Sequence, residues 1–198
     1  MKAKERKAKV ARKTRETNIV ASVNLDGKGV YSIRTGLPFF DHMLELLSKH
    51  SLIDLTLRAT GDLAVDYHHT VEDIGLTLGA ALDKALGDRR GIVRYGCATV
   101  PMDETLARAV VDLGGRPWLE VRMACRKKKI LDFDLSLFGE FFQALTVQTR
   151  MNLHIEQFYG SEAHHAYEAV FKALARALRQ AAERDPRNRA LPSSKGAL

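Results

Sequence analysis

The chain contains one short pattern twice, and this repetition limits the folds that it can adopt. The segment YHHTVEDIG covers residues 67–75, and AHHAYEAVF covers residues 163–171, ninety-six positions later. Both contain the word H-H-x-x-E. Apolar identities continue at the same offset, at Leu78/Leu174, Ala81/Ala177, Leu82/Leu178 and Ala85/Ala181. Because these identities fall on one face of a helix, they indicate an internal duplication.

The predicted elements around the two words support this interpretation. In the first half, residues 17–33 alternate and contain Asp26-Gly27, which is typical of a β-hairpin. A helix over 37–50, with Asp41 as its N-cap, a strand over 51–62 and a helix over 70–88 follow. In the second half we expect strands within 92–103, 106–123 and 129–135, a helix over 137–149, a strand over 151–160 and a helix over 164–183. The order predicts one α+β domain with pseudo-twofold symmetry.

Charge is distributed unevenly along the chain. Of the 31 Lys and Arg residues and 24 acids, residues 1–15 hold eight and one, so the remainder carries 23 of each. The net charge of +7 therefore comes from one end of the chain. We expect residues 1–13 to be a disordered basic tail. A nucleic-acid arm and an organellar targeting peptide are the alternatives. The near-neutral remainder argues against nucleic acid as a partner.

The domain boundaries follow from these patterns. We expect a single domain over 14–198, made of pseudo-repeats at about 14–98 and 99–185, with an irregular C-terminal tail over 186–198 that binds substrate. No apolar run approaches the ~20 residues of a membrane span, so no membrane is expected as a partner. The two cysteines, Cys97 and Cys125, do not form a C-x-x-C motif, and we expect a cytoplasmic protein.

The repeated word predicts metal chemistry. On a helix, the glutamate lies three and four positions after the two histidines, so it shares a face with each. Adjacent histidines point about 100° apart, so one helix is not expected to send both to one ion. Two doublets therefore suggest two metals, each with ligands from both copies. Imidazole and carboxylate suit Mn, Fe, Zn, Ni or Co.

The duplication extends the set of candidate ligands. His42 precedes His68 by 26 residues, and Glu140 precedes His164 by 24, so the two occupy related places. The predicted metal ligands are His42, His68, His69, Glu72, Glu140, His164, His165 and Glu168. Cationic and hydroxyl side chains elsewhere could hold an anionic substrate. These are Arg94, Arg116, Lys172, Ser193, Ser194 and Lys195.

The motifs FFDHML, HHTVEDIG, MDE, GGRPW, HHAYEAVFKALARALRQA, DPR and PSSKG occur in this order. Together they resemble the imidazoleglycerol-phosphate dehydratase family of histidine biosynthesis, from about Arg12 to Leu198. The resemblance implies a monofunctional hydro-lyase that converts D-erythro-1-(imidazol-4-yl)glycerol 3-phosphate to 3-(imidazol-4-yl)-2-oxopropyl phosphate. It further implies two Mn²⁺ ions, a duplicated unit resembling the ribosomal protein S5 domain 2-like fold, and a homo-oligomer of 24 subunits with metal sites at subunit interfaces.

The resemblance also assigns roles to residues. Glu16 would be the acid/base and a substrate contact. The phosphate would be held by Arg94, Arg116, Lys172, Ser194 and Lys195. The sequence departs from the family pattern at Glu140, commonly histidine, and at Leu46, where many relatives have glutamine.

Three other classes of function remain as alternatives. A metal-storage assembly would need the histidines but not Glu16 or the PSSKG segment. A dinuclear phosphoesterase usually has aspartates bridging its metals, and the repeated word lacks them. A nucleic-acid binder is suggested only by the basic tail.

Overall fold

The computed structural model describes residues 5–197 of the chain, and its elements fall into two halves of the same order. The first half consists of β1 (Lys7–Lys13), β2 (Thr17–Asn24), β3 (Tyr31–Arg34), α1 (Pro38–Ser51), β4 (Asp54–Gly61) and α2 (His68–Leu86). The second consists of β5 (Tyr95–Met102), β6 (Thr105–Asp112), β7 (Trp118–Arg122), β8 (Lys129–Ile130), β9 (Phe133–Asp134), α3 (Leu137–Thr149), β10 (Asn152–Tyr159) and α4 (Ala163–Ala182). Apart from the small β8–β9 pair, the halves correspond element by element.

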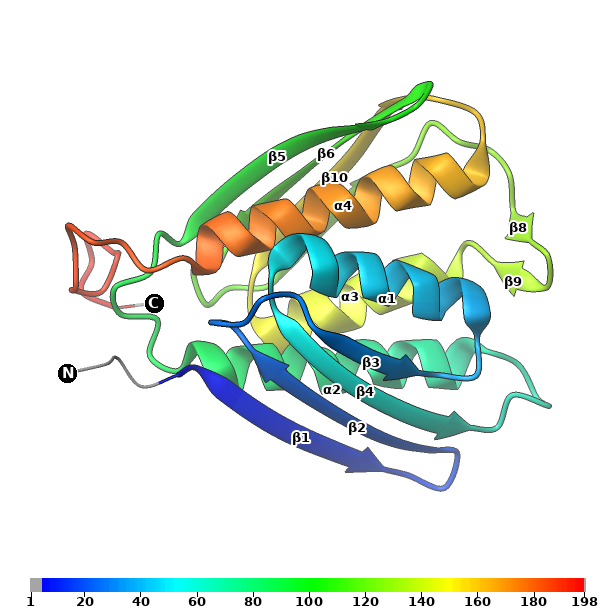
Figure 1. Cartoon of the computed structure of the whole chain (residues 1–198), viewed down its shortest axis with the longest axis horizontal. Coiled ribbons are helices and arrows are strands. Elements are labelled where there is room, and N and C mark those ends of the chain that lie inside the picture. The colour runs from blue at the N-terminus through cyan, green and yellow to red at the C-terminus, as the bar shows by residue number, and fades with distance from the viewer. Residues whose placement is uncertain (1–4, 198) are drawn as a thin grey trace.

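The two four-stranded sheets share one topology. Their orders are β1-β2-β4-β3 and β5-β6-β10-β7, and in each the last pair is parallel while the others are antiparallel. The sheets form the outer layers, and the four helices lie between them (Figure 1). Helices α1 and α4 pack together, as do α2 and α3. The duplicated α+β fold is therefore confirmed.

Small residues let the helices of the two halves approach closely. Gly75 and Gly79 lie on the face of α2 that packs against α3, and a Cβ on Gly75 would lie 2.8 Å from the Cβ of Ala144. Phenylalanines fill the core beside them, and Phe40, Phe141 and Phe171 are fully buried. This packing fixes the starting points of the helices relative to one another. None of the helices over residues 5–197 is both long and apolar enough to cross a bilayer.

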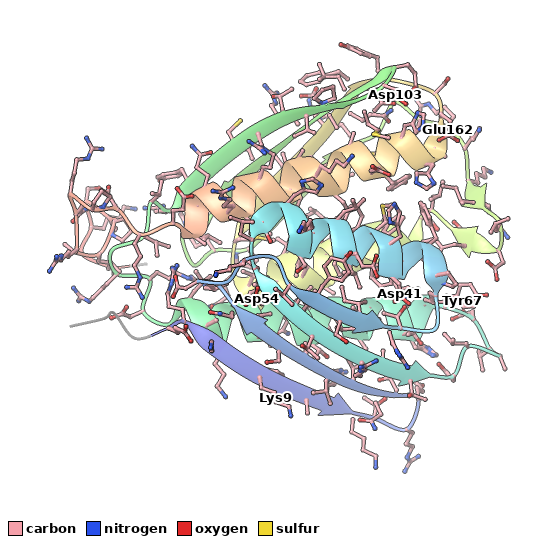
Figure 2. All side chains as sticks on the ribbon, viewed as in Figure 1. Lys9, Asp41, Asp54, Tyr67, Asp103 and Glu162 are labelled. Atoms are coloured by element: carbon pink, nitrogen blue, oxygen red, sulfur yellow. The ribbon has the colours of Figure 1, made fainter. Side chains whose placement is uncertain are left out.

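The predicted disordered tail is wrong for residues 7–13. Residues 7–13 form β1, which pairs in antiparallel register with β2 from Lys7/Asn24 to Lys13/Asn18. Ala8 is buried, whereas Lys9 points away from the sheet (Figure 2). The basic composition concealed a strand because every second residue faces solvent, and lysines on an edge strand discourage pairing with other chains. Residues 1–4 lie outside the described part of the chain.

The boundaries of the pseudo-repeats move accordingly. The first half begins at β1 rather than at residue 14, and the second begins at Tyr95 in β5, its counterpart, rather than at residue 99.

The predicted hairpin over residues 17–33 is also wrong. Strand β4 lies between β2 and β3, so the segment around Asp26-Gly27 crosses over rather than closing a tight turn. Asp54 organises this crossover, because its Oδ1 accepts the backbone N–H groups of Lys28 at 2.8 Å and Val30 at 2.9 Å. Alternation identified the strands, but it carries no information on strand order.

Candidate functional site

The predicted metal ligands come from the starts of all four helices. His42 lies in α1, His68 opens α2, Glu140 is in the first turn of α3, and His164 is the second residue of α4. These starts lie at one end of the molecule, where Figure 2 labels Tyr67 and Glu162 just before α2 and α4. The prediction that Asp41 is the N-cap of α1 is wrong, because the helix begins at Pro38 and Asp41 lies within its first turn. Asp41 Oδ1 instead accepts the N–H and Oγ1–H of Thr35.

Three of the predicted ligands meet at this end of the molecule. His42 Nε2 lies 3.4 Å from Glu168 Oε2, and His164 Nε2 lies 3.2 Å from the same oxygen. One candidate ligand atom from each residue lies within 4.8 Å of the others. The cluster joins the two halves of the duplication, with His42 from the first and the other two from the second. Two imidazoles and a carboxylate suit a first-row divalent metal.

Lys172 lies beside this cluster rather than with the other predicted phosphate ligands. Its Nζ is 2.5 Å from Glu168 Oε1, the oxygen that faces away from the histidines. Burial acts to raise the pKa of Glu168, but the hydrogen bond and charge of Lys172, with a smaller contribution from His42, lower that pKa overall. Glu168 is therefore a carboxylate at neutral pH, as a metal ligand must be.

The first copy of the word forms a looser arrangement. His68 Nε2 lies 3.7 Å from Glu72 Oε2, and Glu140 is exposed on α3, the helix packed against α2. Within residues 5–197, no second group of three histidine or acidic side chains has its ligand atoms within 4.8 Å of one another. The eight predicted ligands are thus not gathered into two complete sites within one chain.

The second histidine of each doublet points elsewhere, as the sequence predicted. The ring planes of His68 and His69 make an angle of 88°, those of His164 and His165 make an angle of 81°, and the two histidines of each pair contact different carboxylates. His69 Nδ1 lies 3.0 Å from Asp62 and 3.8 Å from Glu16. His165 Nδ1 lies 2.7 Å from Glu104.

These carboxylates shift the pKa values of the histidines. The hydrogen bond that His69 donates to Asp62 raises the pKa of His69, and the one that His165 donates to Glu104 raises the pKa of His165. In return, His165 lowers the pKa of Glu104 to about 2. Sequence reasoning missed Asp62 and Glu104. The available signal was their position at strand ends that face the helix starts.

A cavity lined by cationic side chains lies at the opposite end of the folded molecule. It has a volume of about 340 Å³ and is lined by residues of β5, the segment after β6 and the C-terminal tail. Four of the five predicted phosphate ligands line it, namely Arg94, Arg116, Ser194 and Lys195. Lys172 does not. Ser193, the other hydroxyl of this segment, lies in the same wall.

Arg94 holds this cavity together. Its guanidinium pairs with both oxygens of Asp112, at 2.7 and 3.1 Å, and its Nη1 donates to the carbonyl of Pro192 at 2.8 Å. The hydrogen bond to Asp112 raises the pKa of Arg94 further. The third contact ties the C-terminal tail to β5, which places the Ser-Ser-Lys segment over the cavity.

Helix α4 separates the cavity from the histidine cluster. His164 stands at the start of α4, whereas the N–H of Arg94 donates to the carbonyl of Ala181 near its end, at 2.9 Å. The helix spans roughly 25 Å between these points, at ~1.5 Å per residue. The red segment that follows α4 and the start of α4 also lie at opposite ends in Figure 1. One small phosphate ester cannot reach both groups in the same chain.

The fold and the site define a duplicated α+β protein with histidine–carboxylate groups at one end and a cavity lined by cationic side chains at the other. Residues 35–178 match the family described as imidazoleglycerol-phosphate dehydratase. A relative of that name from Dinoroseobacter shibae is 54% identical over 194 residues, covering 98% of this chain and 100% of the relative. One from Symbiobacterium thermophilum is 55% identical, covering 98% and 93%.

Solved structures agree with the sequence comparisons. The imidazoleglycerol-phosphate dehydratase of Staphylococcus aureus superposes with a TM-score of 0.82 at 39% identity, covering 90% of this chain and 99% of that chain. That of Pyrococcus furiosus, in complex with (S)-C348, gives 0.83 at 36% identity, covering 95% and 99%. The chain belongs to the imidazoleglycerol-phosphate dehydratase family, and it is a hydro-lyase.

Proposed function

We propose that the chain catalyses the Mn²⁺-dependent dehydration of D-erythro-1-(imidazol-4-yl)glycerol 3-phosphate to 3-(imidazol-4-yl)-2-oxopropyl phosphate, in the cytoplasm. The observation that carries the proposal is the meeting of His42, His164 and Glu168 in a family member that also has a cationic cavity. The cavity suits a phosphate, and the two free cysteines suit a reducing compartment.

The metal would be held by residues that fit it chemically. His42, His164 and Glu168 would hold one ion, and the related residues His68, Glu72 and Glu140 would contribute to a second. His69 and His165 contact other carboxylates, Asp62 and Glu104, and would serve ions shared with neighbouring chains. When bound, two such ions would supply Lewis acidity and a template for the imidazole ring. Carboxylate replaces the commoner imidazole at Glu140, and it remains a suitable ligand for manganese.

Glu16 would move the proton. In the dehydration, a C–H bond breaks at the middle carbinol carbon and the hydroxyl on the ring-bearing carbon leaves as water. The resulting enol then tautomerises to the ketone. Glu16 stands in the β1–β2 turn, 3.8 Å from His69, with 53% of its side chain exposed. A carboxylate so placed can take up and return a proton, an effect worth roughly 10²–10⁴-fold in rate.

The active site would be assembled from several chains. Because the histidine cluster and the cationic cavity lie at opposite ends of α4, the phosphate would bind Arg94, Arg116, Ser194 and Lys195 of one chain while the imidazole meets metals held by others. Lys172, beside Glu168, would approach the substrate from the metal side. We propose a closed homo-oligomer, the 24-mer implied by the family, as the active form.

The departure at Leu46 is compatible with this scheme. Its side chain is partly buried and packs against the hydrophobic core, so it adds to the stability of α1 rather than offering a polar group to the substrate. Activity would therefore depend on the other contacts.

The test is anaerobic purification, metal analysis and an assay of imidazoleglycerol-phosphate turnover with and without Mn²⁺. We expect about two metals per chain and turnover that requires them. Glu16→Gln should keep the metals but lose at least about 100-fold in kcat, the lower range for a general acid–base. Bound metal without turnover in the wild type would refute the proposal and favour metal storage, whereas release of inorganic phosphate would favour a phosphoesterase.

A further inference from the structure

The two halves treat one equivalent carboxylate differently. Glu16 and Glu104 each end the turn of the first hairpin in their half, and each directly precedes a buried threonine, Thr17 or Thr105. The hairpins β1–β2 and β5–β6 occupy the same place in the two sheets. Glu104 is therefore the duplicate of Glu16. Each lies near the second histidine of its half's doublet, Glu16 at 3.8 Å from His69 and Glu104 at 2.7 Å from His165.

Glu104 is fully engaged in structural contacts. Its Oε2 faces His165 Nδ1 at 2.7 Å, and its Oε1 accepts the hydroxyl of Thr105 at 3.1 Å and the N–H of Glu162 at 3.3 Å. The last contact ties the turn to the residue before α4. Figure 2 shows Asp103, the other residue of this turn, near Glu162. Both oxygens of Glu104 thus have partners.

In the first half, Asp62 rather than Glu16 makes the close contact with the second histidine, His69. Asp62 Oδ2 faces His69 Nδ1 at 3.0 Å, and it comes from the end of β4 rather than from the hairpin turn. Asp62 follows Gly61, whereas the residue after Gly160 at the end of β10 is Ser161, which carries no carboxylate. Only the first half therefore has an acid at this position.

The chemistry of these contacts is directional. A carboxylate only accepts hydrogen bonds, so it holds the proton of a neutral imidazole on the nitrogen it faces. The other nitrogen then keeps a lone pair for a metal, and metal-binding histidines commonly have such a carboxylate partner. Here the carboxylates face Nδ1 of His69 and His165, which leaves Nε2 of each as the ligand atom.

We propose that Asp62 and Glu104 are positioning residues that present Nε2 of His69 and His165 to metal, and that Asp62 thereby releases Glu16 for proton transfer. The proposal rests on the proposed function, and it explains why Glu104 is held close to its histidine whereas Glu16 lies 3.8 Å from His69 and stays available to the substrate. An identical arrangement in both halves would leave both glutamates bound to histidines.

The test measures Mn²⁺ affinity separately from turnover. Mn²⁺ is titrated into metal-free protein and the free ion is followed by electron paramagnetic resonance. We expect Asp62→Ala and Glu104→Ala to weaken Mn²⁺ binding about 10- to 100-fold, the usual effect of losing such a partner. Asp62→Asn and Glu104→Gln should recover part of the affinity, because an amide oxygen still accepts the Nδ1 proton. Circular dichroism establishes that each variant is folded.

Two control variants make the result specific. Glu16→Gln should bind Mn²⁺ as the wild type does while losing kcat, and Glu156→Gln, which removes an exposed charge paired with Arg108, should change neither. Wild-type affinity in folded Asp62→Ala and Glu104→Ala would overturn the proposal, as would a Glu16→Gln variant that weakens Mn²⁺ equally. Wild-type protein that binds Mn²⁺ without turnover would refute the proposed function alone, since the affinity comparison does not use the reaction.

Discussion

Substituting Gly96 by alanine tests whether the close packing of α4 on its sheet positions the histidine cluster. Gly96 lies in β5 under α4, and a Cβ there would overlap the carbonyl oxygen of Ala177 and lie 2.8 Å from its carbonyl carbon. It would also lie 3.0 Å from the backbone nitrogen of Ala181. These are backbone atoms of a helix, so relief requires α4 to move away from the sheet. His164 and Glu168 would move with it.

The expected cost follows from the size of this overlap. Overpacking a core costs about 1–3 kcal/mol and occasionally more, and a backbone clash belongs at the upper end of that range. Alanine gains about 0.5–1 kcal/mol by restricting the unfolded chain. The net loss should be about 2–3 kcal/mol, which for a domain of this size lowers Tm by roughly 4–12 °C.

The measurement is thermal and urea unfolding followed by circular dichroism. Gly139→Ala is the matched control, because Gly139 is helical and a Cβ there would meet nothing within 4 Å. We expect that control to be neutral or slightly stabilising. A Gly96→Ala protein within about 0.5 kcal/mol of the wild type, the range of ordinary surface changes, would refute the packing argument.

Three further predictions follow from the strands around the site. Thr17→Val should cost about 1–3 kcal/mol in urea unfolding, because Thr17 Oγ1 donates to Asp73 at 2.5 Å in a buried position; an unchanged midpoint would contradict this. Asp54→Asn should destabilise by about 1–2 kcal/mol at pH 7, since hydrogen bonds to a charged group are lost. Backbone hydrogen bonds outweigh burial and hold the folded pKa of Asp54 below 3.8, so its contribution is present above pH 3.8 and is lost as pH falls through the folded pKa. The stability gap between Asp54→Asn and wild type should therefore narrow in acid. Deleting residues 1–13 should expose the edge of β2 and produce aggregation in light scattering, whereas a dispensable tail would leave the protein monodisperse.

The duplication could be predicted from sequence because it leaves repeated short motifs and matching helical spacing of apolar residues. The repeated word H-H-x-x-E and the apolar identities after it indicated two halves with the same order of elements. The repeat also predicted that His42 and Glu140 occupy related places in the two halves. The divergence of the paired histidines was likewise predictable, because it depends only on helix geometry. His164 and His165 accordingly contact different carboxylates, Glu168 and Glu104.

The features that sequence analysis missed depend on contacts between distant segments. Whether β2 pairs with β3 or with β4 is decided by the crossover at Asp54, which alternation does not encode. The strand at residues 7–13 was hidden because its charged residues dominate its composition. Asp62 belongs to no motif, and Glu104 belongs only to the short MDE segment, to which sequence analysis assigned no role. The roles of both depend on which histidine each faces.

The structure brings some of the predicted site residues together within one chain and leaves others apart. His42, His164 and Glu168 meet within one chain, whereas Glu140 does not meet the first histidine pair closely enough to form a cluster. The cationic residues gather as expected, except for Lys172, whose partner is Glu168. Spacing along the chain gives the chemistry of these residues, but not which chain completes each site.

The central claim is that metal ligands and phosphate ligands act together only between chains, and a mixing experiment tests it directly. His164→Ala and Arg116→Ala chains, each expected to be inactive alone, are co-expressed in equal amounts and assayed for imidazoleglycerol-phosphate turnover. If each site takes the two groups from different chains, random mixing restores roughly a quarter of the sites in a closed oligomer. No recovery in mixed oligomers that bind Mn²⁺ would contradict the account, because both groups would then have to come from one chain.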